Sequence, residues 1–469
     1  MRVRERQSEA WPVDPSRHGQ VESTGGLRPR RICVVGCGYV GLVTATGFAS
    51  VGHYVVGLDN DQSRIQMLRE GRVPFFEPGL EEKVRENQAE GHLAFTTDYE
   101  EAIAGAEFVF LAVNTPEHGD GCPNLTNLWQ AVLTVRKAAR DHRPIIMVKS
   151  TVPIGTTQAL ASLLNTVSDN GTPWSVVVNP EFLSEGQALN AFLHCDRVVL
   201  GSNDERALRE AASLYDSFDC PIVSAEFATA ETIKYASNAF LATKLSFINE
   251  IAFLCESLGV DVREVARGIG LDPRIGLSFL KAGVGFGGSC LPKDTRTLVN
   301  LAREAGEEST LFPAVMRVND RRRAVVVDRL RQALSGLEGR VVCLWGLAFK
   351  PNTDDIRDAP SIDIIRLLLA DGAIVRAYDP MANARVGALF PQVTYCPDAL
   401  TACEGADALV LLTEWQEFEG IDLQEARRRM QGDVLLDGRY VWQRSHVETA
   451  GFRYLNLAPA QPIRTPIHR

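Results

Sequence analysis

Short apolar runs alternate with helix-length segments over the first half of the chain. The first run, Arg31–Val35, leads into a glycine-rich loop, an apolar helical stretch and a second run at Tyr54–Leu58. Three more runs follow, at 107–113, 144–149 and 175–179. Short apolar runs bounded by turn signals are typical of strands buried on both faces, and their alternation with helices is typical of a parallel sheet. The pattern predicts an open, doubly wound α/β domain.

The second half of the chain repeats this alternation. It begins at residue 340, and further runs lie at Ile374–Tyr378, 408–412 and 434–436. Between the two patterns, residues 226–258 contain no glycine or proline. A continuous helix of that length would extend about 50 Å, enough to join two lobes and to offer a dimer surface, although a plain core helix is the alternative. We expect an α/β protein with two open doubly wound (Rossmann-like) domains joined by a long central helix.

Composition excludes several classes of protein. The 49 basic and 59 acidic side chains give a net charge of −10, which disfavours binding to nucleic acid or to an anionic membrane. No apolar stretch approaches the roughly 20 residues of a membrane span. The first 29 residues lack the apolar core of a secretory signal, and we expect them to be either a disordered extension or residues that precede the true start site. The ten cysteines include no CxxC pair, which argues against a metal site and predicts a reduced, cytoplasmic protein.

The glycine-rich loop has the full context of a dinucleotide site. Gly36, Gly38 and Gly41 follow a strand and open a helix, and Asp59 ends the next strand. These glycines permit a tight turn, close approach to a pyrophosphate and close helix–strand packing. Asp59 would accept hydrogen bonds from a ribose diol and repel a 2′-phosphate, which favours NAD over NADP. The alternative is a purely structural glycine turn.

Two loops that end strands should line the same cleft, because ligands of open α/β sheets bind at the carboxyl ends of the strands. One loop carries Thr115 and Pro116, and the other carries Ser150 and Thr151. Their hydroxyl groups could instead only cap turns or helices. The sequence leaves both interpretations open.

One cysteine stands in an unusual setting. Four glycines lie within the seven residues before Cys290, and Pro292 predicts that a helix begins just after it. A helix N-terminus lowers a thiol pKa and favours a nucleophile. Asp294 would lie near the same face of that helix. A buried, inert cysteine is the ordinary alternative, and this setting favours the nucleophile.

Six segments together resemble the UDP-glucose/GDP-mannose dehydrogenase family, from about residue 31 to about residue 444. These segments are residues 36–41, 76–80, 179–183, 231–238, 285–290 and 346–350. The family oxidises a nucleotide-sugar alcohol to an acid with two NAD. The resemblance therefore implies a four-electron oxidation. It also implies a division of the chain into five parts, which are an extension (1–29), an NAD-binding domain (30–222), a central helical dimerisation region (223–325), a C-terminal UDP-sugar-binding domain (326–455) and a tail (456–469).

The resemblance also implies catalytic roles. Cys290 corresponds to the nucleophile, which adds to the aldehyde to form a thiohemiacetal and later carries a thioester. Lys234 and Asn238 resemble the pair that holds the substrate oxygen. The remaining implied roles are those of acid/base groups, for Glu181 and Asp294, and that of a residue that positions water, for Thr151.

Binding residues follow from the same resemblance. For the cofactor they are Gly36, Gly38, Tyr39, Val40, Gly41, Asp59, Arg64, Thr115, Pro116, Ser150, Thr151, Glu185, Lys293 and Arg357. For the sugar nucleotide they are Glu181, Phe182, Leu183, Glu185, Lys234, Asn238, Arg274, Phe279, Lys281, Gly287, Phe349, Lys350 and Arg439. The resemblance implies a homodimer or a higher homo-oligomer, in which Arg274 is expected to reach the substrate across a dimer interface, and no metal is expected.

Within the family, residues 270–281 and 236–242 resemble the branch that converts UDP-glucose to UDP-glucuronate. Ser289 argues against the N-acetylated UDP-sugar branch, which usually has histidine before the cysteine. GDP-mannose or another nucleotide sugar is the alternative substrate. From other classes, a non-catalytic NAD or nucleotide-sugar binding protein and a simple one-step alcohol dehydrogenase remain alternatives, although neither needs the cysteine.

Overall fold

The computed structural model describes residues 28–117, 121–139, 142–166 and 173–457. The expected extension and tail lie outside this part, apart from residues 28–29 and 456–457. The described residues form two compact units, of which the first ends at Ala236 and the second begins at Ser237. Within them, none of the helices combines the length and the apolar character that crossing a bilayer requires.

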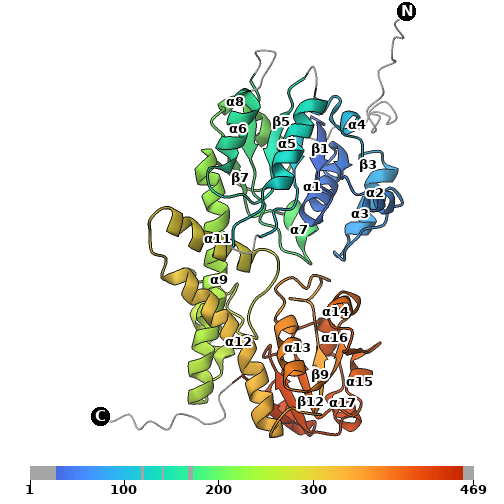
Figure 1. Cartoon of the computed structure of the whole chain (residues 1–469), viewed down its shortest axis with the longest axis vertical. Coiled ribbons are helices and arrows are strands. Elements are labelled where there is room, and N and C mark those ends of the chain that lie inside the picture. The colour runs from blue at the N-terminus through green and yellow to red at the C-terminus, as the bar shows by residue number, and fades with distance from the viewer. Residues whose placement is uncertain (1–27, 118–120, 140–141, 167–172, 458–469) are drawn as a thin grey trace, which may run out of the picture. The chain divides into compact units, whose positions relative to one another are not determined.

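The first unit is built on an eight-stranded sheet in the order β3-β2-β1-β4-β5-β6-β7-β8 (Figure 1). The strands are β1 (Arg31–Val35), β2 (Tyr54–Leu58), β3 (Leu93–Thr96), β4 (Phe108–Leu111), β5 (Ile145–Val148), β6 (Val176–Val178), β7 (Val198–Gly201) and β8 (Ile222–Ala225). All neighbours are parallel except β6 and β7, where Val178 pairs with Gly201 in the antiparallel sense. The five strands that the sequence predicted, β1, β2, β4, β5 and β6, pair in parallel as expected, whereas β7, which the sequence did not predict, runs antiparallel to β6.

Helices cover both faces of this sheet. They are α1 (Tyr39–Ser50), α2 (Gln62–Arg69), α3 (Leu80–Ala89), α4 (Tyr99–Ile103), α5 (Thr126–Ala138), α6 (Thr156–Thr166), α7 (Ala188–Leu193) and α8 (Glu205–Ala212). Along β1, Ile32 and Val34 join the core that contains α1, whereas Cys33 and Val35 join the core that contains α5. Burial on both faces explains why the strand is a continuous apolar run rather than an alternating one.

The predicted long helix is confirmed as α9 (Phe227–Leu258), a single helix of 32 residues. The other helices of the central region are α10 (Val262–Gly270), α11 (Leu291–Glu304) and α12 (Leu311–Leu334). Two of the expected domain boundaries fall inside elements, since 222/223 lies within β8 and 325/326 lies within α12.

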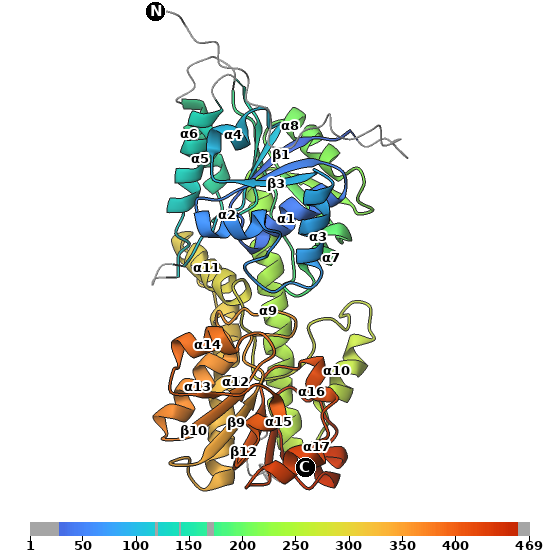
Figure 2. The same ribbon diagram turned by 90° about the vertical axis from the view of Figure 1, so that its right-hand side faces the viewer.

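The second unit contains a six-stranded, fully parallel sheet in the order β11-β10-β9-β12-β13-β14 (Figure 2). Its strands are β9 (Val341–Trp345), β10 (Ile374–Tyr378), β11 (Thr394–Tyr395), β12 (Ala408–Leu411), β13 (Val434–Asp437) and β14 (Arg453–Leu455). The helices between them are α13 (Pro360–Ala370), α14 (Asn383–Leu389), α15 (Ala399–Ala402), α16 (Gln416–Glu419), α17 (Leu423–Arg429) and α18 (Arg444–Thr449). The two parallel-sheet domains and the long helix confirm the predicted fold class.

All ten cysteines lie within the described residues, and none of them forms a disulfide. Six are buried, as expected of packing residues, whereas Cys122, Cys195, Cys220 and Cys290 are partly exposed. The sulfur atoms of Cys195 and Cys220 lie 2.7 Å apart, although the two residues are 25 positions apart in the sequence. The spacing of the cysteines along the sequence did not predict this contact between two thiols.

Candidate active site

The glycine loop opens into a cavity of about 310 Å³ in the first unit. The cavity lies where β1 has β2 on one side and β4 on the other, which is the point where the strand order reverses. Ligands of open α/β sheets bind at this kind of crevice. Its lining includes Gly36, Gly38, Asp59, Arg64 and Asn114.

The outer two glycines of the loop are required by packing. Gly36 has φ of +96°, and a Cβ there would lie 2.6 Å from the carbonyl oxygen of Ala112. A Cβ on Gly41 would lie 1.7 Å from the carbonyl oxygen of Gly36. Gly38 precedes the first residue of α1 as its N-cap, and a Cβ there would meet only Asn114, at 3.7 Å. The backbone at Gly38 is therefore open toward a ligand, and the helix dipole favours an anion there.

Asp59 is buried beside the same cavity and is already oriented by the protein. It accepts hydrogen bonds from the Cys37 N–H (2.8 Å) and the Asp61 N–H (3.0 Å), and it forms an ion pair with Arg64 (2.9 Å). These contacts fix the carboxylate at the end of β2, where the ribose of a dinucleotide is expected. The residues that we predicted around the adenosine half of NAD are thus brought together.

The strand-end hydroxyls point to backbone carbonyls. The Ser150 hydroxyl lies 2.7 Å from the Val113 carbonyl oxygen, and the Thr115 hydroxyl lies 3.0 Å from the Thr151 carbonyl oxygen. These bonds tie the two loops to each other, which favours the capping interpretation for Ser150 and Thr115. Thr151 itself is half-buried beside them.

Glu77 organises the loop that carries Leu183 and Glu185. Its carboxylate accepts hydrogen bonds from the N–H groups of Gly186 and Ala188, both at 2.6 Å, and from the Tyr39 hydroxyl. Ala188 begins α7, so the carboxylate satisfies amides at the positive end of a helix. Tyr39 is therefore held by a carboxylate rather than left to turn freely.

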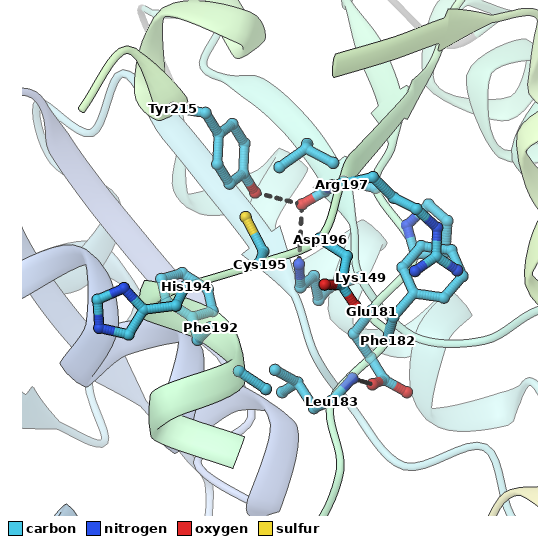
Figure 3. Close-up of a pocket in the computed structure, with 14 residues that line it drawn as sticks. Lys149, Glu181, Phe182, Leu183, Phe192, His194, Cys195, Asp196, Arg197 and Tyr215 are labelled. Atoms are coloured by element: carbon cyan, nitrogen blue, oxygen red, sulfur yellow. Dashed lines mark hydrogen bonds between the residues drawn. The ribbon is translucent and has the colours of Figure 1, made fainter. Parts of the chain in front are cut away.

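A buried ion pair joins Lys234 on α9 to Glu181, which is labelled in Figure 3. The Lys234 ammonium donates to a Glu181 carboxylate oxygen (2.9 Å) and to the Glu181 carbonyl oxygen (2.7 Å). The other carboxylate oxygen accepts from the Leu183 N–H at 2.6 Å. Burial alone would raise the pKa of Glu181, but Lys234, the Leu183 N–H and the charge of Lys149 together hold it below its ordinary value. The carboxylate of Glu181 is therefore held in its ionised form.

Phe182 lies against cations. The guanidinium of Arg197 stacks 3.7 Å from the centre of its ring, and the Lys234 ammonium lies 5.5 Å from it. The ring therefore covers one side of the Glu181–Lys234 pair with apolar surface and shields it from water.

The glycine segment before Cys290 is buried in the second unit and is held by amide side chains. Asn249 on α9 accepts from the Gly283 N–H (2.8 Å), and Asn319 on α12 accepts from the Phe286 N–H (2.7 Å). Arg322 donates to the Gly283 carbonyl oxygen at 2.8 Å, and it also forms a buried ion pair with Glu256. Backbone groups that are satisfied in this way give the loop one defined shape.

Cys290 is the N-cap of α11, as predicted, and Pro292 lies in the first turn. The side chain of Cys290 is partly exposed, unlike those of the buried cysteines, and its sulfur lies 3.5 Å from the Ser289 hydroxyl. The thiol is therefore at the positive end of a 14-residue helix. The alternative of an inert core cysteine does not fit this position.

Asp294 lies on the first turn of the same helix and is fully buried. It accepts hydrogen bonds from the amide of Asn238 (2.6 Å) and from the ammonium of Lys293 (2.5 Å). Four of the predicted residues, Cys290, Lys293, Asp294 and Asn238, are thus brought together in the second unit. The side-chain nitrogen of Asn238 carries two N–H groups, and one of them donates to Asp294.

A second group of predicted residues packs beside the glycine segment. Arg439 reaches the carbonyl oxygens of Leu412 (2.6 Å) and Phe349 (3.4 Å), and a Cβ on Gly288 would lie 2.8 Å from the Phe349 ring. A Cβ on Gly287 would lie 2.3 Å from the Asp358 carbonyl oxygen. Lys350 lies above the Phe349 ring, with 5.4 Å between its nitrogen and the ring centre.

Three predicted cations lie at the surface instead. Arg274 and Arg357 are exposed and fold back onto their neighbours Asp272 and Asp355. Lys281 is exposed as well. Phe279, at φ of +62°, is the non-glycine residue of this stretch with a left-handed backbone.

Four further polar side chains shape the site and were not among the predicted residues. Lys149 and Asn179 hydrogen-bond beside Glu181, and Glu77 shapes the loop after it. Glu231 accepts from the N–H groups of Gly155 (2.6 Å) and Thr157 (2.8 Å) and so fixes the start of α6. Glu77, Asn179 and Glu231 stand inside three of the six segments, and that position was the available signal. Lys149 lies in none of them and ends the apolar run at 144–149.

Among the described side chains, no group of three or more histidine, cysteine, aspartate and glutamate residues is arranged to hold a metal ion. A dinucleotide does fit, because the cavity at the strand-order reversal joins an open helix N-terminus to a fixed carboxylate. We assign Gly36, Gly38, Asp59 and Arg64 to the part of the site that would hold it.

Three family models together match most of the chain. In the UDP-glucose/GDP-mannose dehydrogenase family, the model of the NAD binding domain matches residues 30–219, that of the central domain 228–321, and that of the UDP binding domain 343–444. The match to an NAD binding domain confirms NAD as the expected cofactor.

Individual relatives agree with these models. The chain is 42% identical over 429 residues to UDP-glucose 6-dehydrogenase TuaD of Bacillus subtilis, covering 91% of this chain and 93% of TuaD. It is also 42% identical to a UDP-glucose 6-dehydrogenase of Pseudomonas aeruginosa, covering 91% and 97%. The structure of a UDP-glucose dehydrogenase from Pyrobaculum islandicum superposes with a TM-score of 0.87 at 40% identity, covering 94% of this chain and all of that one. On this evidence, the chain belongs to the UDP-glucose/GDP-mannose dehydrogenase family.

Proposed function

We propose that the protein oxidises UDP-glucose to UDP-glucuronate in two steps, with two NAD and one water consumed. The observation that carries the proposal is the partly exposed thiol of Cys290 at the start of α11. An alcohol dehydrogenase that makes one hydride transfer has no use for such a thiol, whereas a thiol can hold the aldehyde as a covalent adduct for a second oxidation to the acid. The relatives named UDP-glucose 6-dehydrogenase support the choice of sugar nucleotide.

Cys290 supplies the covalent step. An aldehyde carbon carries no hydroxyl group whose electron pair could expel a second hydride from that carbon. Addition of the thiolate converts the aldehyde into a tetrahedral thiohemiacetal, which has such a hydroxyl and can be oxidised. Oxidation of this adduct leaves a thioester on Cys290, and water then releases the acid and restores the thiol. Bound NAD supplies the hydride acceptor for each of the two oxidations.

The other polar groups move protons and hold the reacting oxygen. Asn238 and Lys234 donate hydrogen bonds to the substrate oxygen, and the ammonium stabilises negative charge as it develops there. Glu181 accepts the proton that hydrolysis of the thioester releases, and Thr151 positions the water. Asp294, which is bound to Asn238 and Lys293, assists deprotonation of the alcohol.

The nucleotide part is assigned to cations and backbone of the second unit. Arg439, Phe349 and Lys350 surround the glycine segment that contains Gly287, and a guanidinium suits a diphosphate because it donates in a bidentate fork. We assign Phe279 and Lys281 to the same ligand. Glu185 and Arg357 are assigned to NAD. Val40 is assigned there as well, since it lies in the first turn of α1.

The proposed reaction is tested by the NADH yield on a limiting amount of each nucleotide sugar. We expect two NADH for each UDP-glucose, with UDP-glucuronate as the product identified by mass spectrometry. Turnover of GDP-mannose or of an N-acetylated UDP-sugar alone would overturn the choice of substrate. One NADH for each sugar would overturn the four-electron reaction, and binding of NAD without any turnover would favour the non-catalytic alternative.

We also propose that the protein is a homodimer through α9. Phe240, Phe247 and Leu254 recur every seven residues on this helix and are 65%, 50% and 58% exposed. Seven residues are close to two helical turns, so the three side chains form one apolar stripe about 21 Å long. A stripe on one helix is self-complementary about a two-fold axis, which makes a second copy of the chain its natural occupant. The expected position of Arg274 near a partner's substrate depends on this dimer.

Charge placed on the stripe should therefore separate the subunits. We expect the Phe240→Glu/Phe247→Glu double variant to sediment with the mass of one 51.5 kDa chain, whereas the unaltered protein sediments with twice that mass. Analytical ultracentrifugation measures this directly. Leu389→Glu is the matched control, because Leu389 is a similarly exposed (56%) apolar residue on α14 outside the stripe. A double variant that keeps the dimer mass would contradict the assignment.

A further inference from the structure

Lys149 is a buried cation that the proposed mechanism does not use. It follows directly after β5, and only 5% of its surface is exposed. Its ammonium donates to the side-chain oxygen of Asn179 at 3.0 Å. No described carboxylate lies within ion-pair distance of it. Because a buried ammonium without a paired anion is unfavourable, an apolar residue of the same length would be the more stable choice for packing alone.

The position of Lys149 points to Glu181. Asn179 follows directly after β6, the neighbour of β5, and Glu181 lies two residues further along the chain. The same oxygen of Asn179 also accepts from the Tyr215 hydroxyl (2.7 Å), and its amide donates to the Val199 carbonyl oxygen (3.0 Å). The side chain of Asn179 is thus held by hydrogen bonds to three residues, and Lys149 is one of these residues.

Lys149 and Glu181 line one cavity of about 80 Å³, and Figure 3 shows both side chains around it. That volume is enough for a few water molecules. The other charged or titratable groups around this cavity are His194, Cys195, Asp196, Arg197 and Tyr215, and Lys234 faces Glu181 from α9. Of the groups that act on Lys149 electrostatically, the carboxylate of Glu181 is the strongest attractive one.

We propose that Lys149 is a positioning residue for Glu181, which keeps its carboxylate ionised through a second buried ammonium and fixes residues 179–181 through Asn179. The proposal rests on the role assigned to Glu181 in thioester hydrolysis. Two ammonium groups then face one carboxylate, and the excess positive charge keeps Glu181 able to accept a proton at neutral pH. Without Lys149, Lys234 would be the one ammonium group assigned to Glu181.

The electrostatics agree with this role. Burial lowers the pKa of Lys149 to about 8, and the charge of Glu181 opposes that decrease. Lys149 therefore remains mostly protonated at neutral pH. In return, the charge of Lys149 is one of the groups that hold the pKa of Glu181 below its ordinary value. Removing Lys149 should raise the pKa of Glu181, so the base would lose its ionised form at a higher pH than in the unaltered protein.

The test compares pH profiles. In Lys149→Met, we expect the acidic limb of kcat to move up by about half to one pH unit, while KM for the nucleotide sugar and for NAD changes less than about twofold. At a pH on this shifted limb, where the unaltered protein is still active, the variant should accumulate the acyl group on Cys290, seen as added mass in acid-quenched protein. Lys149→Arg keeps the charge and should restore the profile. A folded Lys149→Met variant with an unshifted profile would overturn the proposal.

Two further variants separate charge from packing. Tyr215→Phe removes the other hydrogen bond to the Asn179 oxygen without changing any charge, and we expect it to leave the acidic limb in place. An equal shift in Tyr215→Phe would show a merely structural role and overturn the proposal. If Lys149→Met fails to fold, Asn179→Asp is the variant to test. A new carboxylate beside Lys149 should also move the acidic limb of kcat to higher pH. An unshifted limb in this variant would overturn the proposal.

The same measurements keep this proposal distinct from the choice of substrate. The pH profiles are recorded with whichever nucleotide sugar the unaltered protein oxidises. If the protein oxidises another nucleotide sugar but not UDP-glucose, the proposed substrate is overturned. The pH profiles of the Lys149 variants are then compared with that other nucleotide sugar, so the proposal for Lys149 is still tested. A protein that forms no NADH from any nucleotide sugar would overturn both proposals.

Discussion

Cys290→Ser is expected to reduce kcat for UDP-glucose oxidation by about 10³-fold or more, the largest effect of any single change. A serine hydroxyl keeps the shape of the thiol at the start of α11 but is hardly ionised at neutral pH, so it adds slowly to the aldehyde. Any ester that forms would persist, because an alkoxide is a poorer leaving group than a thiolate.

Steady-state NADH formation and the intact mass of the quenched protein measure the two effects. We expect the mass spectrum of the variant to contain a covalent sugar-nucleotide adduct. Cys195→Ser is the matched control, since Cys195 is another partly exposed cysteine and the same atom is exchanged. Full activity of Cys290→Ser would remove the nucleophile from the mechanism and, with it, the observation that carries the proposed function.

Lys234→Met is expected to have the second largest effect, on both activity and stability. The donor to the developing oxyanion is lost, which should lower kcat by about 10²–10³-fold. The side chains of Lys234 and Glu181 are only 3% and 6% exposed, and removing one partner of such a buried pair costs roughly 3–5 kcal/mol. The free energy of unfolding should therefore decrease as well.

The sign of the pH dependence follows from Glu181. In the unaltered protein its pKa lies below the ordinary value, so its ionisation stabilises the fold at neutral pH, and this contribution is lost as the pH falls through that lowered pKa. Without Lys234, burial raises the pKa, and the charged carboxylate becomes unfavourable at neutral pH. The decrease in Tm should therefore be largest near pH 7–8 and should become smaller toward pH 4–5.

Thermal unfolding at several pH values checks this prediction. Lys244→Met is the matched control on the same helix, because the Lys244 ammonium bonds the carbonyl oxygens of Ile275 and Gly276 rather than a carboxylate. We expect its Tm to change little and without the same dependence on pH. A decrease in the Tm of Lys234→Met that is constant from pH 4 to pH 8 would show that the ion pair does not control the ionisation of Glu181.

The sequence predicted central elements better than edge elements. The bounds of β2 and β10 were predicted to the residue, and those of α9 within one residue, because buried parallel strands and a helix without glycine or proline carry strong local patterns. Strand β8 was missed because its middle residues are exposed, and β11 because it has only two residues. For such strands, pairing with a neighbour rather than local pattern decides their existence.

The candidate site shows the same limit. Cys290 and Asp294 were recognisable because they lie four residues apart beside a glycine run. The groups that shape this loop come from far along the chain, since Asn249 bonds Gly283 across 34 positions and Asn319 bonds Phe286 across 33. Lys149 reaches Asn179 across 30 positions. Local spacing carries no signal for such contacts, which exist only once the sheets and helices have assembled.

The close approach of Cys195 and Cys220 has a practical consequence for chemical labelling. Two thiols 2.7 Å apart can both be captured by a bifunctional reagent such as a trivalent arsenical, whereas Cys290 offers one sulfur. A monofunctional alkylating agent would report on all the partly exposed thiols together, so loss of activity after its use would not identify the reactive group. Labelling with an arsenical first, and then with an alkylating agent, should distinguish the paired thiols from Cys290 by chemistry rather than by mutation.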